Sequence, residues 1–336
     1  MSATATRTRE RVFSGMRPTG RLHIGHWFGA LKNWVRLQDD YDCVYSVVDL
    51  HALTTGFQDV SRIHEDGIEM VADWIGAGVD PQRSIVFRQS QVPEHSELAL
   101  LLGMATPKSW LERVPTYKGQ IAELGDEIDT FGFFGYPVLQ TADIVLYHAT
   151  KVPVGQDQLP HLELAREIVR RFNHLFGKGD EVFPEPKAVL TEAPVLLGID
   201  NRKMSKSYNN AIELGASPDT IGGMVSKMIT DPEKIKRADP GHPEICNVFS
   251  YDKLFGTPAE RVDEIERTCR SGELGCVDHK QEIAERIGEY MRPFRERREQ
   301  ALADRGELER ILREGAERAR EIAVPNMERA REAMGL

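Results

Sequence analysis

Hydrophobic and polar positions follow two different patterns along the first two-thirds of the chain. Short runs rich in β-branched residues are separated by longer stretches in which apolar residues recur every three or four positions. The first pattern predicts strands and the second predicts amphipathic helices. The predicted strands are Arg11–Gly15, Cys43–Asp49, Ser84–Gln89 and Lys151–Val154. The predicted helices are His26–Leu37, Ser61–Ala77, Glu94–Met104, Gln140–Ala149 and about 157–172. This alternation predicts an α/β fold with a parallel sheet wrapped by helices.

The strand pattern fades in the last third of the chain. Residues 217–336 predict mostly helices, with breaks at Asp231–Pro232, Asp239–Gly241 and Gly272. We therefore expect a domain boundary near Leu214–Pro218, followed by a smaller, all-helical domain.

Composition narrows the possible classes of function. No apolar run approaches the ~18 residues that cross a bilayer, and the first residues, MSATATRTRERVF, contain no apolar signal core. We therefore expect a cytoplasmic protein that makes no membrane contact. The net charge of −10 argues against a protein that coats DNA or RNA non-specifically. It leaves room for a local basic face that binds RNA.

The four cysteines show no metal-binding pattern. Cys43, Cys246, Cys269 and Cys276 form no C-x-x-C pair, and no histidine follows them at zinc-finger spacing. We expect them to be free thiols in a reducing cytosol and predict no protein-bound metal.

The C-terminal stretch Arg286–Leu336 combines 12 arginines with 11 acidic residues. One interpretation is an arginine array that faces RNA. The favoured one is a set of solvated helices whose charges pair at helical spacing.

The segment His23-Ile24-Gly25-His26 follows the first predicted strand and opens a predicted helix. The turn before it contains neither G-x-G-x-x-G nor a Walker A sequence. A metal site is not favoured, because no third ligand lies near the two histidines in sequence. A helix start presents free backbone N–H groups to a phosphate, Gly25 permits close approach, and the histidines can donate hydrogen bonds.

A second candidate element is the segment Arg202–Ser207, which reads R-K-M-S-K-S. Its two lysines and two serines make a cationic loop suited to a polyphosphate, and lysines can stabilise charge that develops on phosphoryl groups. A solvated basic loop is the alternative when the segment is taken alone.

The chain resembles the class I aminoacyl-tRNA synthetases in two motifs taken together: H-I-G-H after the first strand and K-M-S-K-S before the domain boundary. The resemblance implies a Rossmann-like catalytic domain in which both motifs bind ATP and stabilise the transition state of amino-acid adenylation. The nucleophile would be the substrate's own carboxylate, so catalysis rests on positioning and electrostatics. Mg²⁺ would bridge the ATP phosphates.

The amino acid is suggested by Asp143, which lies in the otherwise apolar stretch GYPVLQTADIVLY. A carboxylate suits a donor-only indole N–H, although a phenol could use the same group. The stretch Val152–Gln158 then supplies an apolar wall followed by polar residues. The chain is short, which fits a substrate discriminated in one step by a polar group.

In this order the motifs are similar to those of the bacterial-type tryptophanyl-tRNA synthetases, from Phe13 to the terminal MERAREAMGL. The resemblance implies activation of L-tryptophan with ATP and transfer to tRNA(Trp). It gives catalytic roles to His23, His26, Lys203 and Lys206. It implies ATP contacts for Arg17, Pro18, Thr19, Gly25, His26, Gly155, Gln156, Asp157, Val195, Lys203, Met204, Ser205, Lys206 and Ser207. It implies substrate contacts for Phe13, Tyr136, Asp143, Val152, Val154 and Gln158.

Three further residues are candidates for the substrate site. Asp49 and His51 lie at the C-terminal end of a predicted strand, where sites in open α/β sheets gather, with strand-end packing as the alternative. Gln140 stands with Thr141 where many relatives have Met-Ala, and Thr116 stands where many have Gln. We hypothesise that these departures give some tolerance for substituted tryptophans.

The same resemblance predicts the organisation of the molecule. Residues 1–214 would form the catalytic domain, with a helix at about 303–336 packing back on it. Residues 215–302 would form a helical anticodon-binding domain. We expect a homodimer whose partners are L-tryptophan, ATP and tRNA(Trp).

Three alternatives remain at this point. A tyrosyl-tRNA synthetase would share both motifs, and Gln140 with Asp143 would suit a phenol. A small adenylyltransferase would share the histidine motif but lack the long helical half. A non-charging relative that acts as a binding partner would be expected to carry a damaged motif, whereas both are intact here.

Overall fold

The computed structural model describes residues 9–114, 117, 119, 121–122, 125–190, 196–205 and 208–336. The chain divides into two compact units. Unit 1 comprises Met1–Gly20, Ala30–Ala193 and Ala301–Leu336, and unit 2 comprises Arg21–Gly29 and Pro194–Gln300. Each unit is therefore discontinuous in sequence.

Unit 1 is built on a five-stranded parallel sheet in the order β3-β2-β1-β4-β5. The strands are β1 (Arg11–Met16), β2 (Asp42–Val47), β3 (Ile85–Arg88), β4 (Lys151–Val154) and β5 (Lys187–Leu190). The predicted α/β class and the four predicted strands are confirmed. The sequence prediction missed β5, because this short edge strand is largely exposed and lacks a run of buried apolar residues.

Helices cover this sheet and connect its strands, as parallel pairing requires. They are α2 (Lys32–Asp40), α3 (Asp49–Gly56), α4 (Ile63–Ala77), α5 (Glu94–Ala105), α6 (Lys108–Glu112), α8 (Phe131–Val145), α9 (Leu159–Phe176) and α14 (Arg305–Met334). Short 3₁₀ turns are η2 (Gln89–Gln91), η3 (Asp126–Ile128) and η4 (Gln156–Gln158). Among the helices in the described part of the chain, none is both long and apolar enough to cross a membrane.

Two predicted helices differ most from their expected bounds. The helix expected from Gln140 begins at Phe131 instead, because the Thr130 side chain caps it by accepting a hydrogen bond from the Phe133 backbone N–H at 3.2 Å. The helix expected at His26–Leu37 is divided into α1 (Ile24–His26), a π-helical turn η1 (Trp27–Leu31) and α2. Pro137 lies inside α8 and does not end it.

The core of unit 1 is continuous from the sheet to the C-terminal helix. Phe13, Val44 and Phe87 of the three adjacent strands belong to one buried cluster with Leu98 of α5 and Ala319 of α14. The small alanines on α14 let this helix approach the sheet closely.

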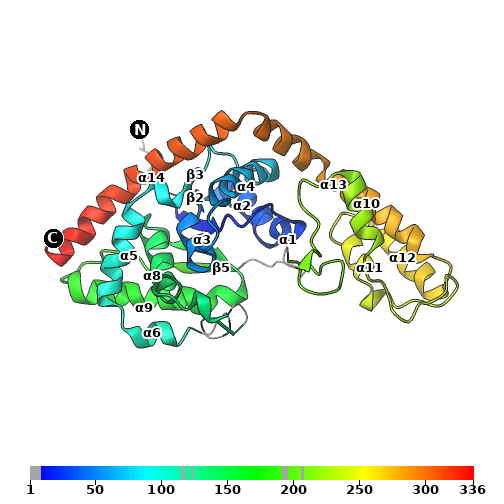
Figure 1. Ribbon diagram of the computed structural model, residues 1–336, viewed down its shortest axis with the longest axis horizontal. Coiled ribbons are helices and arrows are strands. Elements are labelled where there is room, and N and C mark those ends of the chain that lie inside the picture. The colour runs from blue at the N-terminus through cyan, green and yellow to red at the C-terminus, as the bar shows by residue number, and fades with distance from the viewer. Residues whose placement is uncertain are drawn as a thin grey trace, which may run out of the picture. The chain divides into compact units, whose positions relative to one another are not determined.

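The helix α14 packs against β3 and α5 (Figure 1). At the closest point Gly315 faces the carbonyl oxygen of Val86, and a Cβ on Gly315 would lie 1.8 Å from that oxygen. Two arginines further along α14 pair with carboxylates of α5. Arg320 contacts Glu94 at 2.7 Å, and Arg331 contacts Glu97 at 2.5 Å. Charge pairing therefore accounts for these arginines of the C-terminal segment.

Unit 2 joins the segment after β1 to the helical part of the chain. Its later helices are α10 (Pro218–Ser226), η6 (Pro243–Ile245), α11 (Asn247–Asp252), α12 (Ala259–Ser271) and α13 (Cys276–Ala303), the last entering unit 1 at its end. The Trp27 indole N–H donates to the Tyr290 hydroxyl at 3.2 Å, and Phe28 contacts Phe255 edge-on at 5.3 Å between ring centroids. The mostly helical character predicted after residue 217 is confirmed.

The unit boundaries differ from the expected division at residue 214. The segments 21–29 and 194–214 belong to unit 2 rather than to the sheet. The physical reason is a set of backbone hydrogen bonds between them. Ile24 N–H donates to the Ile212 carbonyl at 2.9 Å, and Leu214 N–H donates to the Leu22 carbonyl at 2.9 Å.

Candidate functional site

Asp143 lies at the centre of a buried polar cluster in unit 1. This residue of α8 is 2% exposed. Its Oδ2 contacts His51 Nε2 at 2.8 Å. Its Oδ1 contacts His95 Nδ1 at 2.6 Å and accepts from Gln89 Nε2 at 2.7 Å. The helices α3, α5 and α8 and the turn after β3 therefore bring four side chains together from distant parts of the sequence.

Asp143 is held in its ionised form. Burial by itself raises the pKa of this carboxyl, but attraction to His51 and His95 and their hydrogen bonds outweigh burial. The net effect is a pKa well below the usual range. A buried carboxylate offers acceptor positions only, so it can bind an N–H donor.

Apolar walls predicted from the sequence lie on adjacent strands of the same unit. Phe13 of β1 is buried and stacks on Tyr147 with ring centroids 5.6 Å apart and planes 7° apart. Val152 and Val154 of β4 are also buried. The neighbouring strands β1 and β4 thus contribute flat and branched apolar groups, the combination that suits an aromatic side chain.

Tyr136 of α8 lies beside this cluster. Its ring contacts that of His51 edge-on at 6.5 Å, and its hydroxyl lies 2.6 Å from His161 Nε2. Burial lowers the pKa of His161, partly offset by Asp157. A neutral imidazole can accept from the tyrosine hydroxyl, which fixes the position of the Tyr136 ring.

Asp49, a predicted substrate contact, makes internal hydrogen bonds. It accepts from the Ser90 backbone N–H at 2.9 Å, the Ser90 hydroxyl at 2.5 Å and the Leu50 N–H at 3.1 Å. These bonds tie the start of α3 to η2, which carries Gln89. In this geometry Asp49 holds the turn that presents Gln89 to Asp143.

The loop after β4 holds the next group of predicted residues. Gly155 precedes the turn η4, and a Cβ on it would lie 2.7 Å from Asp157 Oδ1. Gln156 and Asp157 are exposed, and Gln158 donates from Nε2 to Asp157 Oδ2 at 3.0 Å. Gln140 is half-buried on α8. This loop lies at the carboxyl end of a parallel strand, where α/β sheets bind ligands.

The other predicted nucleotide contacts of unit 1 follow β1. The Arg17 guanidinium donates to the Thr55 hydroxyl at 3.4 Å, and the Thr19 N–H donates to the Arg17 carbonyl at 2.9 Å. Pro18 lies between them, and Gly20 takes a left-handed φ of 94°. This turn ends unit 1 before the histidine motif.

In unit 2, His23 and His26 form a reciprocal cap at the start of α1. His23 takes an extended conformation, the His26 backbone N–H donates to the His23 carbonyl at 2.8 Å, and the His23 N–H donates to His26 Nδ1 at 3.1 Å. His26 Nδ1 therefore carries no proton, so in the neutral ring the hydrogen is on Nε2. That nitrogen is a donor suited to a phosphate oxygen.

The described part of the K-M-S-K-S segment lies beside the histidine motif within unit 2. A Cβ on Gly25 would lie 3.6 Å from the Met204 sulfur. Asn210 fixes the base of the loop, because it accepts from the Ser205 N–H at 2.8 Å and donates to the Lys203 carbonyl at 3.1 Å. Lys203 itself is exposed. The predicted residues Val195, Lys206 and Ser207, and the position Thr116, lie outside the described residues.

Sequence reasoning missed four residues of the Asp143 neighbourhood: Gln89, His95, Tyr147 and His161. Gln89 was assigned only to the end of a strand. His95 and His161 each lie on buried faces of helices, α5 and α9. A histidine on an otherwise apolar helical face is the signal that could have singled them out.

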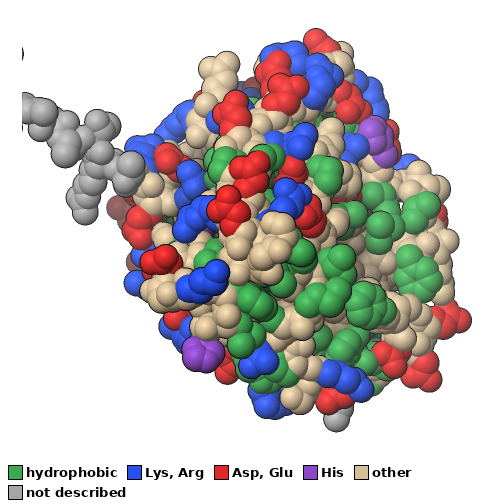
Figure 2. All heavy atoms as spheres, turned by 90° about the vertical axis from the view of Figure 1, so that its left-hand side faces the viewer, with side chains coloured by type: hydrophobic (Ala, Val, Ile, Leu, Met, Phe, Trp, Pro, Cys, Tyr) green, Lys and Arg blue, Asp and Glu red, His purple; other side chains and the backbone are tan. Residues whose placement is uncertain are grey.

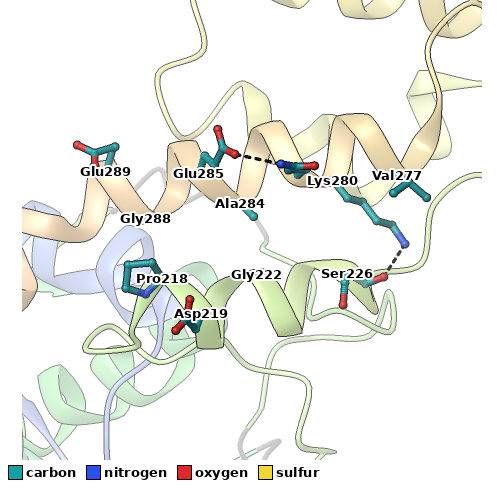
Figure 3. Close-up of a pocket in the computed structure, with 11 residues that line it drawn as sticks. Pro218, Asp219, Gly222, Ser226, Val277, Lys280, Ala284, Glu285, Gly288 and Glu289 are labelled. Carbon is teal, nitrogen blue, oxygen red and sulfur yellow. Dashed lines mark hydrogen bonds between the residues drawn. The ribbon is translucent and has the colours of Figure 1, made fainter.

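A separate hollow of about 690 Å³ lies between α10 and α13 (Figure 3). Asp219, Glu285 and Glu289 line it, together with Lys280, whose Nζ donates to the Ser226 carbonyl at 2.9 Å. Its acidic lining does not suit a phosphate.

Within the described ranges, no group of three or more His, Cys, Asp or Glu side chains is arranged to hold a metal ion. All four cysteines are free thiols.

Comparison with known proteins gives consistent matches over almost the whole chain. The family described as tRNA synthetases class I (W and Y) matches residues 5–291. The tryptophan--tRNA ligase of Thermotoga maritima is 46% identical, over 97% of this chain and 99% of the relative. That of Aquifex aeolicus is 43% identical, over 97% of this chain and 100% of the relative.

The solved structures agree. The tryptophanyl-tRNA synthetase of Campylobacter jejuni, complexed with ADP and tryptophan, has a TM-score of 0.88 and 36% identity. The match covers 97% of this chain and 100% of that one. A tyrosyl-tRNA synthetase from Archaeoglobus fulgidus, at 20% identity and a TM-score of 0.65, shares the fold. The resemblance inferred from the two motifs is confirmed, and the chain belongs to the class I tRNA synthetases of the W and Y family.

Proposed function

We propose that this chain is a tryptophan--tRNA ligase. It activates L-tryptophan with ATP to give tryptophanyl-adenylate and pyrophosphate, and it then transfers tryptophan to tRNA(Trp). The observation that carries the choice of amino acid is Asp143, an ionised and almost fully buried carboxylate near apolar walls. The identity of 46% to a tryptophan--tRNA ligase supports the same choice.

In this proposal the indole N–H donates to Asp143, and Phe13, Val152 and Val154 pack against the ring. Tyr136 and Gln158 contact the ammonium and carboxylate of the substrate. The carboxylate oxygen of tryptophan attacks the α-phosphorus of ATP, and the bond from that phosphorus to the pyrophosphate leaving group breaks. No side chain needs to act as a nucleophile.

The phosphates of ATP are assigned to the donors of the two motifs. His26 Nε2 donates to a phosphate oxygen, and Lys203 with Lys206 balances the charge of the leaving pyrophosphate. Arg17, Thr19 and the Gly155–Asp157 loop contact the nucleotide. Mg²⁺ would enter with ATP, because this ion is usually bound through substrate phosphates rather than by a site made only of protein ligands.

The remaining partners are also proposed. The helical part of unit 2 contacts the anticodon of tRNA(Trp), whose unstacked bases are accessible to side chains. The protein acts in the cytoplasm. It is a homodimer, and unit 1 offers a suitable surface: α3, α5, α6 and α8 surround an apolar hollow of about 650 Å³. Figure 2 shows hydrophobic side chains gathered on this side of unit 1.

ATP–pyrophosphate exchange tests the proposal. The purified full chain is assayed with tryptophan, with tyrosine and with no amino acid, and then with tRNA(Trp) for charging. Exchange that depends on tryptophan, followed by charging, is the expected result. Exchange that depends on tyrosine would overturn the role of Asp143, and absence of exchange would overturn the enzymatic proposal.

A further inference from the structure

The hydrogen bonds to Asp143 leave one acceptor position unused. A carboxylate oxygen can accept two hydrogen bonds in its plane. Oδ1 has two partners, Gln89 and His95, whereas Oδ2 has one, His51. The His51 side chain is 11% exposed and the His95 side chain is fully buried. The remaining position is therefore on Oδ2, on the more open side of the cluster.

The orientation of the His95 ring follows from its two neighbours. Its Nδ1 lies 2.6 Å from the Asp143 carboxylate, which can only accept, so Nδ1 carries the hydrogen. Its Nε2 lies 2.6 Å from the Tyr147 hydroxyl. Burial, Asp143 and Glu94 raise the pKa of Tyr147 well above its usual value, so the hydroxyl keeps its proton. The contact with Tyr147 fixes the His95 ring in the orientation that directs its Nδ1–H at Asp143.

We propose that His95, oriented by Tyr147, is a positioning residue that makes Asp143 an acceptor-only site and thereby selects an indole N–H over a phenol O–H. This inference rests on the proposed function, in which Asp143 binds the amino-acid side chain. His95 acts through Asp143 and need not touch the substrate.

The selectivity follows from the hydrogen-bonding capacity of the two ligands. Indole N–H is a donor only and is fully satisfied by the free position on Oδ2. A phenol can donate to the same position, but its oxygen also accepts. The N–H donors of His51, His95 and Gln89 that face this carboxylate are already engaged with it. The phenol oxygen would lose its hydrogen bonds to water without replacement, a source of strong discrimination.

The first test compares two substitutions of His95. Asn carries an N–H donor close to the position of His Nδ1, whereas Leu fills similar space without a donor. We expect His95→Leu to lower kcat/KM for tryptophan by about tenfold to hundredfold, the effect of losing a hydrogen bond to a charged group. The change is expected in KM for tryptophan, with KM for ATP unchanged. The tryptophan-to-tyrosine ratio of kcat/KM should fall, and His95→Asn should restore most of it.

The second test uses a matched pair of tyrosines. Tyr147→Phe removes the hydroxyl that fixes the His95 ring, with almost no change in volume. Tyr45→Phe removes a similarly buried hydroxyl, which donates to the Trp34 carbonyl at 2.8 Å away from this cluster. We expect Tyr147→Phe to reduce the tryptophan-to-tyrosine ratio by about twofold to tenfold. Tyr45→Phe should leave the ratio unchanged while it lowers thermal stability.

Asp143→Asn separates failure of this inference from failure of the proposed function. If Asp143→Asn weakens tryptophan binding but both His95→Leu and Tyr147→Phe leave the substrate ratio unchanged, the positioning role is overturned and the indole site stands. If Asp143→Asn leaves tryptophan binding unchanged, both are overturned. The positioning role would also be overturned if Tyr45→Phe lowered the tryptophan-to-tyrosine ratio of kcat/KM as much as Tyr147→Phe does. Such a result would reflect general loosening of the core.

Discussion

The backbone N–H of His23 donates a hydrogen bond to Nδ1 of His26 at 3.1 Å. This bond directs the remaining ring hydrogen of His26 to Nε2, away from its own backbone. The two rings lie 3.9 Å apart between centroids, so the residue between them must leave space. Gly25 does so, because a Cβ there would lie 2.9 Å from both Cε1 and Nδ1 of His23. Local packing thus explains the spacing of the motif, independently of the phosphate contacts proposed for it.

We predict that Gly25→Ala lowers kcat for ATP–pyrophosphate exchange. The added methyl displaces the His23 ring and with it the His26 donor, and a misplacement of about 1 Å can cost ~10²-fold in rate. The matched control is Gly29→Ala in the following π-helical turn, where a Cβ meets no atom within 4 Å. Exchange rates at saturating tryptophan and ATP measure both. Equal rates for the two variants would contradict the packing argument.

The contact between α14 and β3 gives a second prediction. Gly315→Ala places a Cβ 1.8 Å from the Val86 carbonyl oxygen, and backbone atoms on both sides cannot rotate away. We expect the free energy of unfolding to fall by about 2–4 kcal/mol, within the range for overpacked or strained cores. Denaturant unfolding measures it. Gly306→Ala, where the nearest atom is Asp304 Oδ1 at 3.4 Å, should be close to neutral.

The parts of the fold that were predictable from sequence are those with a strong local pattern. Lys151–Val154 matches β4 at both ends because its alternation and its flanking turn are both clear. Phe131–Val145 was predicted nine residues late, since Gly132, Gly135 and Pro137 are turn signals in isolation. The capping bond from Thr130 and burial of Phe133 and Val138 outweigh them. Tertiary packing decides such segments, and one sequence does not reveal it.

The candidate site divides in the same way. Asp143 could be singled out because a carboxylate in an apolar helix is rare enough to require a partner. Its partners Gln89 and His95 could not, because they come from segments that meet Asp143 only after the sheet has formed. His51 was a candidate only through its place at the end of a strand. Asp49 illustrates the converse. Its position after a strand was visible, whereas its bonds to Ser90 depend on the turn that follows β3.

His148 predicts a loss of stability in mild acid. Burial lowers its pKa to about 4, and the nearby positive charges of Arg329 and Arg11 act in the same direction. The unfolded chain binds the proton near the ordinary value of 6.5. Stability is therefore complete above pH 6.5 and falls as the pH drops from 6.5 toward 4. We expect this residue to account for about 1–2 kcal/mol of the loss, reduced from the full shift because it is only half-buried.

His148→Asn should flatten this part of the pH dependence. His148 has a left-handed φ of 49°, and Asn tolerates that conformation. Unfolding free energies of the wild type and the variant at pH 7 and pH 5 give the comparison. His174→Asn replaces an exposed histidine of α9 and should leave the wild-type slope in place. An unchanged slope in His148→Asn would show that other groups cause the acid sensitivity.

The apolar face of unit 1 predicts how the proposed dimer can be dissociated. Met104 is 70% exposed and Phe131 is 88% exposed, and both line the hollow between α5 and α8. Exposed apolar side chains grouped around one hollow are unusual on a monomer and typical of an interface. A twofold dimer would place the same patch of both subunits together, so one substitution acts twice. Met104→Glu with Phe131→Glu should therefore convert the dimer to a monomer in light scattering, because it buries four unpaired charges.

Leu175→Glu, an exposed apolar position on α9, is the control and should remain dimeric. A wild-type chain that is monomeric at micromolar concentration, or a double variant that stays dimeric, would remove this face from the proposed assembly.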